Sequence, residues 1–144
     1  MRFIKLLLLM LFLAAGSAFA YDYNIDWKAS KLEDAAYQVA HKLRHETGFS
    51  HVSAHARRFA REVSHFRRVV RSGAHARTVR KEFRYIRGKF YRLMSAFRHS
   101  HDVHHSYNVR WSIKKLKFNY RRLREEIFRN DNKYNPFHWN YPNG

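Results

Sequence analysis

Residues 79–97, VRKEFRYIRGKFYRLMSAF, carry apolar side chains at alternating steps of four and three residues. These side chains belong to Val79, Phe83, Ile86, Phe90, Leu93 and Phe97. Such a repeat places them on one face of an α-helix, whereas a half-buried strand would alternate apolar and polar residues. The stretch therefore predicts a helix with a single apolar seam.

Three other segments show the same spacing, and none shows the alternation of a strand. Their seams comprise Leu32, Ala36, Val39 and Leu43; Val52, Ala56, Phe59, Val63, Phe66 and Val70; and Val109, Ile113, Leu116, Tyr120, Leu123 and Ile127. Stripes of this kind line a protein core far more often than a cofactor pocket. The sequence therefore predicts an all-α protein with four core-facing seams.

Polar residues and glycines between the seams predict where the helices begin and end. Ser30 and Glu33 have the spacing of a capping box, so we expect the first helix to begin at Ser30. The other expected boundaries are Thr47–Gly48, a cap at Ser50, Ser72–Gly73, and the connection 99–106. Because short connections make consecutive helices antiparallel neighbours, we predict an up-down-up-down four-helix bundle.

The first 20 residues have the pattern of a secretory signal peptide. Arg2 and Lys5 precede an apolar run over residues 6–15, and Ala18-Phe19-Ala20 resembles a signal-peptidase site. The apolar run is shorter than the roughly 20 residues that a membrane-spanning helix needs. We expect cleavage after Ala20, no transmembrane segment in the remaining chain, and a periplasmic or secreted protein.

The chain that remains after such a cleavage is predicted to consist of one domain and a tail. Residues 21–129 form the helical domain, and residues 130–144 form an irregular tail rich in asparagine and aromatic residues. Pro136 and Pro142 oppose helix formation there. The tail either folds back over the bundle or serves as a docking segment, and folding back is the favoured alternative. The predicted architecture resembles that of small exported helical-bundle proteins of the bacterial envelope. This resemblance concerns architecture alone and assigns no functional residue.

Charge is the strongest functional signal. Without Arg2 and Lys5, 27 lysines and arginines stand against 11 acidic residues, a formal charge of +16. That far exceeds what solubility requires, so we expect a polyanionic partner: lipopolysaccharide, anionic lipid, acidic glycan or nucleic acid bound without sequence specificity. The residues expected to bind it are Arg57, Arg58, Arg61, Arg67, Arg68, Arg71, Arg80, Lys81, Arg84, Arg87, Lys114, Lys115, Lys117, Arg121 and Arg122. Trp111 and Phe118 lie off the last seam. The alternatives are surface contacts or a wider buried face, and we expect the wider buried face.

Histidines supply the rival hypothesis, a site for Zn²⁺, Ni²⁺ or Cu²⁺. The predicted topology brings the first and third connections to the same end of the bundle, and imidazole suits these metals. The candidate ligands are His41, His45, His51, His55, His99, His101, His104, His105 and Asp102. Most of them fall off the apolar seams, so a solvated or pH-responsive patch is the alternative.

We expect no enzyme activity. The chain has no cysteine, no glycine-rich phosphate loop and no nucleophile elbow, and Glu125-Glu126 is an adjacent carboxylate pair. Neighbouring residues on a helix point in different directions, which makes this pair a poor general acid and base. The sequence favours a binding protein, with an oligomeric state that it does not define.

Overall fold

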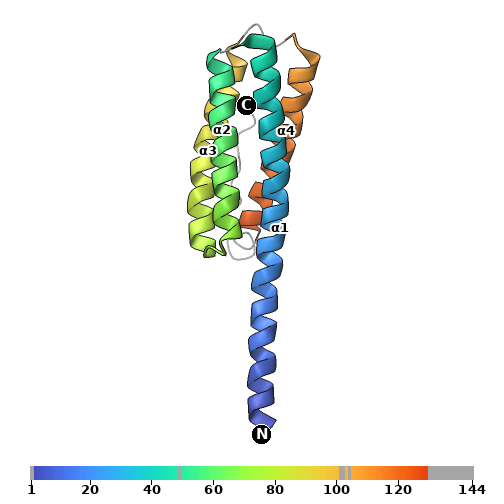
Figure 1. Cartoon of the computed structure of the whole chain (residues 1–144), viewed down its shortest axis with the longest axis vertical. Coiled ribbons are helices and arrows are strands. Elements are labelled where there is room, and N and C mark those ends of the chain that lie inside the picture. The colour runs from blue at the N-terminus through green and yellow to red at the C-terminus, as the bar shows by residue number, and fades with distance from the viewer. Residues whose placement is uncertain (1, 49, 101–102, 104, 130–144) are drawn as a thin grey trace, which may run out of the picture.

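The computed structural model describes residues 2–48, 50–100, 103 and 105–129, and their side chains from residue 23 onward. Within these residues the chain forms four helices: α1 (Arg2–Thr47), α2 (His51–Arg71), α3 (Ala76–Arg98) and α4 (Tyr107–Phe128). They run alternately up and down, side by side (Figure 1). The predicted four-helix bundle is confirmed. The tail, residues 130–144, lies outside the described residues.

The four seams form the core of this bundle. Every seam residue predicted from the sequence is buried except Phe97, which is half-buried and packs against the same core. The core also contains Ile25, Ala29, Ala35, Ala40 and Met94. Because these side chains make one continuous cluster, the helices cannot separate without exposing apolar surface to water.

Helix α1 starts much earlier than predicted. The expected beginning at Ser30 is wrong, because the helix runs without interruption from Arg2 to Thr47 and its N-terminal part projects beyond the other helices (Figure 1). Ile25 and Ala29 continue the seam toward the N-terminus, and both are fully buried. The carboxylate of Glu33 is engaged by α2 instead of capping Ser30. No helix in the part of the chain whose side chains are described is long and apolar enough to cross a membrane.

The other predicted helix ends are confirmed. Ser50 is the N-cap of α2 and accepts a hydrogen bond of 3.2 Å from the backbone N–H of Ser53. Gly48 and Gly73 follow the ends of α1 and α2 with φ of 62° and 71°, a left-handed conformation that glycine adopts without strain. These turns return the chain over short distances, which brings the α1–α2 and α3–α4 connections to the same end of the bundle (Figure 1).

The helices are not equally close to one another. Helix α1 packs closely on α2 and α4, whereas the backbones of α3 and α4 approach at few points. Alanines line α1 at Ala29, Ala35, Ala36 and Ala40, and small side chains permit close backbone approach. Between α3 and α4 the space is filled by rings, with Phe90 and Tyr120 stacked at a centroid distance of 3.9 Å. Side-chain size therefore sets a tight side and a wide side of the bundle.

Candidate polyanion-binding surface

The predicted cationic residues of α2 and α3 lie mostly on the outside of the bundle. Arg57, Arg58, Arg61, Arg68, Arg71, Lys81, Arg84 and Arg87 are exposed, and Arg80 is half-buried. Two acidic residues, Glu62 and Glu82, accompany them on these helices, and both are half-buried. The outer face of α2 and α3 is therefore strongly basic, as the sequence predicts.

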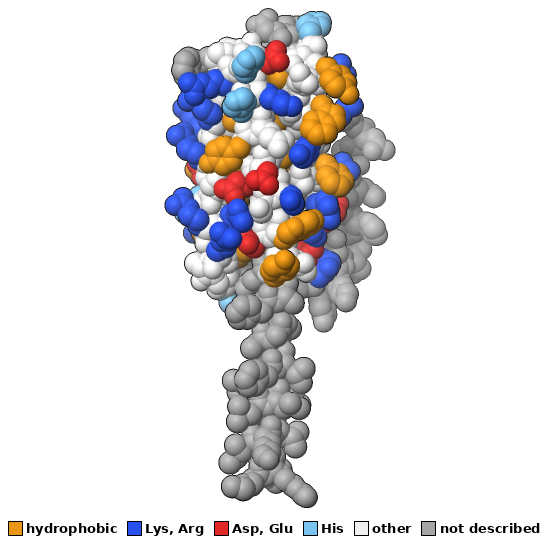
Figure 2. All heavy atoms as spheres, turned by 45° about the vertical axis from the view of Figure 1, so that its right-hand side comes forward, with side chains coloured by type: hydrophobic (Ala, Val, Ile, Leu, Met, Phe, Trp, Pro, Cys, Tyr) orange, Lys and Arg blue, Asp and Glu red, His pale blue; other side chains and the backbone are white. Residues whose placement is uncertain are grey.

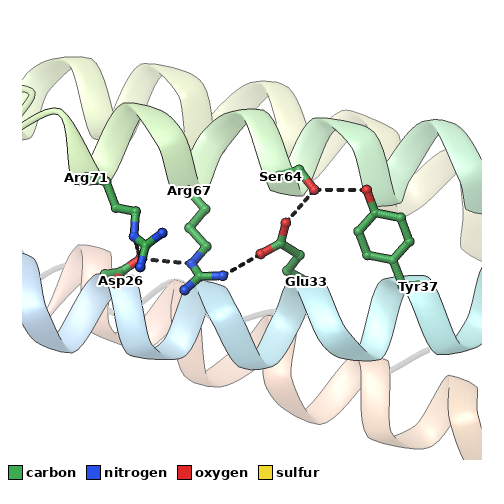
Figure 3. Close-up of polar contacts among 6 residues, drawn as sticks. All are labelled: Asp26, Glu33, Tyr37, Ser64, Arg67 and Arg71. Atoms are coloured by element: carbon green, nitrogen blue, oxygen red, sulfur yellow. Dashed lines mark hydrogen bonds and ion pairs between the residues drawn. The ribbon is translucent and has the colours of Figure 1, made fainter.

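Arg67 has a different position from the other predicted arginines. Its Nε donates to Asp26 Oδ1 at 3.0 Å and its Nη1 donates to Glu33 Oε2 at 2.8 Å, both on α1 (Figure 3). These hydrogen bonds raise the pKa of Arg67 further above its ordinary value. Arg71 also approaches Asp26, with Nε 3.4 Å from the carboxylate. Two carboxylates of the chain itself thus neutralise the charge that Arg67 would offer to a partner.

Hydroxyl groups extend this network. Ser64 donates to Glu33, and the hydroxyls of Tyr37 and Ser64 are 3.2 Å apart (Figure 3). Because the proton of Ser64 points to the carboxylate, Tyr37 must donate to Ser64. The polar contacts of α1 with α2 therefore form one connected chain from Asp26 to Tyr37.

On the other side of α1, cations contact aromatic rings instead of carboxylates. Trp27 lies 5.4 Å from Cζ of Arg122 and 5.8 Å from Nζ of Lys31, while Phe118 lies 5.6 Å from Cζ of Arg122. Trp111 has Nζ of Lys115 at 5.5 Å and Nζ of Lys42 at 5.7 Å from its ring centroid. All these distances are within the range of cation–π attraction. We call these seven residues the α1/α4 strip.

The α1/α4 strip is open to solvent. Trp27, Trp111 and Phe118 are 42%, 49% and 57% exposed, so about half of the surface of each residue is accessible to solvent. Figure 2 shows hydrophobic side chains in a column along this face, with lysines and arginines beside them. The strip therefore combines exposed large rings with adjoining cations on one face of the bundle.

The expectation that Trp111 and Phe118 widen the buried face is therefore wrong. Trp111, Lys115, Phe118 and Arg122 follow one another at steps of four, three and four, which defines a second stripe on α4. Helix α1 faces the Trp111 and Lys115 part of this stripe with long polar side chains, Lys42 and Gln38, and Gln38 Oε1 accepts from Lys115 Nζ at 3.3 Å. Even with these side chains beside them, Trp111 and Phe118 are 49% and 57% exposed. The mixed basic and aromatic composition of this stripe is the sequence feature from which the exposure of Trp111 and Phe118 could have been predicted.

Lys114, Lys117 and Arg121 are exposed on α4, and Lys115 and Arg122 are half-buried within the α1/α4 strip. Beneath the strip, the buried carboxylate of Glu126 binds Lys28 and also lies 3.4 Å from Nη2 of Arg129. The α1–α4 contact thus has an internal ion pair near the core and cations on its outer side.

The histidines of the described residues gather in part at the end predicted for them. His51, His55 and His99 line one open hollow between the start of α2 and the end of α3, with a volume of about 810 Å³. The rings of His51 and His55 meet edge to face at a centroid distance of 4.5 Å. Arg92, Ser50, Ser95 and Ser100 complete its polar lining. We call this feature the polar hollow.

The remaining candidate metal ligands do not join this group. His41, His45 and His105 are exposed, and His101, Asp102 and His104 lie outside the described residues. Within the described part of the chain, no three histidine, aspartate or glutamate side chains are placed so that they could hold one metal ion. The structure brings together a histidine pair with a third histidine nearby.

Comparisons with known proteins add no relative: no protein-family model, no curated protein and no solved structure matches the chain.

Proposed function

We propose that this protein is an exported binding protein that attaches to the anionic surface of a membrane, through lipid phosphates such as those of phosphatidylglycerol or lipopolysaccharide. The observation that carries this proposal is the α1/α4 strip, where exposed tryptophan and phenylalanine rings alternate with lysine and arginine. Binding without catalysis is part of the proposal.

Membrane association suits these residue types. Tryptophan combines a large apolar ring with one N–H donor, and it prefers the boundary between lipid headgroups and hydrocarbon. Lysine and arginine cover apolar surface with their stems while their charged ends reach the phosphates. The two tryptophans and Phe118 come from α1 and α4, which lie side by side, so one flat face of the bundle can contact a planar surface.

A nucleic acid is a poorer fit to the same strip. Single strands bind to proteins by stacking bases on open aromatic faces. Trp27 and Trp111 each already have two cations within 5.8 Å of the ring centroid, so a base would have to displace them. Lipid phosphates can instead contact those cations where they are.

The net charge supports the same partner over longer distances. Without residues 1–20 the chain has a formal charge of +16, and the outer face of α2 and α3 adds a second basic surface. Such a charge draws the protein toward an anionic surface before contact and slows its departure. The α1/α4 strip then supplies the apolar contact that makes attachment persist when salt screens the charge.

Export is proposed from the sequence of residues 1–20. The projection of the N-terminal part of α1 beyond the other helices is compatible with its removal, because the described core begins at Ile25. Intact-mass measurement of the protein exported by the expressing cell checks this: the chain should begin at Tyr21. A mass that includes residues 1–20 would contradict cleavage.

The membrane proposal is tested with vesicles and the protein as the cell processes it. Sedimentation should bring the protein down with vesicles containing phosphatidylglycerol, and with lipopolysaccharide, but not with pure phosphatidylcholine. In a Trp139→Phe background, the emission of Trp27 and Trp111 should shift to shorter wavelength on binding. Raising NaCl from about 0.1 to about 1 M shortens the Debye length from about 10 to about 3 Å and should release part of the protein.

Variants of the rings separate the strip from general basicity. The Trp111→Ala/Phe118→Ala double variant should bind these vesicles at least about tenfold more weakly, since each buried aromatic ring contributes on the order of 2 kcal/mol. The matched control is Tyr85→Ala/Tyr91→Ala, which removes two exposed rings from α3. An equal loss in both double variants would refute the strip as the contact, and binding to single-stranded DNA without vesicle binding would refute a membrane partner.

Metal binding is kept as a second candidate because His51 and His55 lie ring to ring on successive turns of α2. Two imidazoles at this spacing chelate Zn²⁺, Ni²⁺ or Cu²⁺ when a third ligand is supplied. Calorimetric titration of these metals into chelator-treated protein tests it. Stoichiometric binding that is lost in His51→Gln and weakens below about pH 6, where imidazole is protonated, is the expected result.

A further inference from the structure

The polar hollow is distinct from the α1/α4 strip. It lies at the end of the bundle between α2 and α3, and none of the seven strip residues lines it. Its volume of about 810 Å³ is sufficient for a small ligand that carries a phosphate group.

The charges around this hollow are of one sign. Arg92 contributes a guanidinium, and His51, His55 and His99 each contribute an imidazole. The hydroxyls of Ser95 and Ser100 supply further donors, and no carboxylate is among the described residues that line it. Arginine and hydroxyl donors converging on one concave site are typical of phosphate recognition.

We propose that the polar hollow binds the phosphate group of a monoester, and that protonation of its histidines strengthens its hold on an anion of fixed charge as the pH falls from neutral into the acid range. Arg92 provides the permanent charge, and the histidines provide charge that depends on pH.

His99 shows how the affinity of the hollow for an anion would change with pH. Its Nδ1 lies 2.8 Å from the carbonyl oxygen of Ser95, which can only accept, so Nδ1 carries the proton of the neutral ring. The Nε2 atom of neutral His99 is then an acceptor and does not bind an anion through a hydrogen bond. Protonation converts Nε2 into a charged donor.

His55 responds in the same direction. It faces His51 and Arg58 on its own helix and Lys89 and Arg92 on α3, and its pKa is lowered by burial first and by these positive groups second. An anion in the hollow would offset those positive charges and raise the pKa of His55 again. Binding of the anion and uptake of a proton should therefore favour each other.

The same surroundings oppose a metal cation. A divalent ion bound to His51 and His55 would face the positive charges of Arg92 and Lys89, which already lower the pKa of His55. A dianion of tetrahedral shape meets attraction at each of these groups. The choice between the two ligands is open to direct measurement.

Sulfate is the appropriate first probe, because it remains a dianion at every pH at which the histidines titrate. In the protein as processed by the cell, the histidine imidazole resonances should shift saturably with sulfate at pH 5.5. The dissociation constant should be about tenfold larger at pH 7.5, which is the expected effect of about one positive charge near the anion. Parallel titrations with inorganic phosphate and glycerol 3-phosphate distinguish a free ion from a phosphate attached to a larger molecule.

Charge-removing variants locate the site. Arg92→Gln should weaken sulfate binding at pH 5.5 and pH 7.5, whereas His55→Gln should weaken it at pH 5.5 and reduce the difference between the two pH values. Arg87→Gln, an exposed arginine of α3 outside the hollow, should leave binding unchanged. Circular dichroism of each variant checks folding. The sulfate titration of the unsubstituted protein tests binding even if a variant does not fold.

Three results would overturn the proposal. Linear, unsaturable shifts would mean that sulfate only screens charge. An equal loss in Arg87→Gln would mean that the anion is attracted by the basic face as a whole. Saturable Zn²⁺ binding without sulfate binding would assign the hollow to a metal.

Discussion

Helix α1 packs against α2 and α4. The arginine that contacts α1 from α2 meets carboxylates, whereas the one that contacts α1 from α4 meets aromatic rings. From α2, Arg67 reaches Asp26 and Glu33, at 3.0 and 2.8 Å. From α4, Arg122 reaches the rings of Trp27 and Phe118, at 5.4 and 5.6 Å. A carboxylate neutralises an arginine, but an aromatic ring leaves its net charge in place. The α1–α2 contact therefore uses arginine to hold helices together, whereas the α1–α4 contact leaves the charge of its arginine without a neutralising carboxylate among the contacts described here.

Burial separates the two contacts further. Asp26 and Glu33 are 25% and 18% exposed, so removal of Arg67 leaves carboxylates with reduced access to water. The rings around Arg122 lose no neutralising charge when it is removed. Variants on the two sides of α1 should therefore have opposite effects on stability and on binding.

The largest effect on stability is expected for the ion pair beneath the α1/α4 strip. Lys28→Met leaves the carboxylate of Glu126, which is 4% exposed, without its nearest cation and should lower the free energy of unfolding by about 2–3 kcal/mol. Urea denaturation measures it. The double variant Lys28→Met/Glu126→Leu should recover most of the loss, and a double variant as unstable as the single one would contradict this explanation.

Arg67→Met should have the next largest effect. We expect a loss of about 1–2 kcal/mol in the free energy of unfolding, because the pairs with Asp26 and Glu33 are partly buried. Vesicle binding should not change. Arg68→Met, at an exposed neighbouring position, is the control, and its stability should stay within about 0.5 kcal/mol of the parent. Vesicle binding that weakens in Arg67→Met alone would reverse the assignment of Arg67.

Arg122→Met should give the reverse pattern. The free energy of unfolding should change by no more than about 0.5–1 kcal/mol, the usual worth of an exposed cation–π contact. Binding to phosphatidylglycerol vesicles should weaken several-fold, and Arg87→Met on α3 should weaken it less. Sedimentation with vesicles and urea denaturation, carried out on the same samples, give both quantities. A stability loss as large as that of Arg67→Met would remove the distinction between the two sides of α1.

The smallest effect concerns pH. His55 has a pKa below its ordinary value of about 6.5, so between the two values the unfolded chain binds more protons than the folded one. Stability should therefore rise with pH through this window and fall as the solution is acidified. Melting temperatures at pH 7.5, 6.5 and 5.5 should fall less steeply in His55→Gln than in His41→Gln, an exposed position on α1. Equal slopes would argue against this role of His55.

The seams and most of the connections could be predicted because they depend on local spacing. Steps of four and three place Phe83 and Phe90 on one face of a helix whatever its neighbours are. Capping at Ser50 and the left-handed glycine at Gly48 are equally local. The start of α1 was missed because the capping pattern at Ser30 competes with a longer periodic helix, and burial of Ile25 and Ala29 favours the longer one.

The roles of individual cations could not be predicted in this way. Arg67 and Arg122 occur in similar sequence surroundings, and only the helix opposite each residue decides whether it meets a carboxylate or a ring. Trp111 is exposed for the same reason, since α1 offers it lysine and not an apolar side chain. The proximity of His51 and His55 follows from their spacing on one helix. Arg92 lines the same hollow only because α3 packs against α2.

The wide side of the bundle has a consequence for its motion. Helices α3 and α4 are joined mainly through rings such as those of Phe90 and Tyr120, and their backbones meet at few points. Opening of this boundary therefore breaks fewer backbone-level contacts than opening of the α1–α2 or α1–α4 boundary. Local opening begins where tertiary contacts are fewest. Amide hydrogens on the facing sides of α3 and α4 should exchange with solvent first, and those of the described core segment of α1, held by two neighbours, should exchange last.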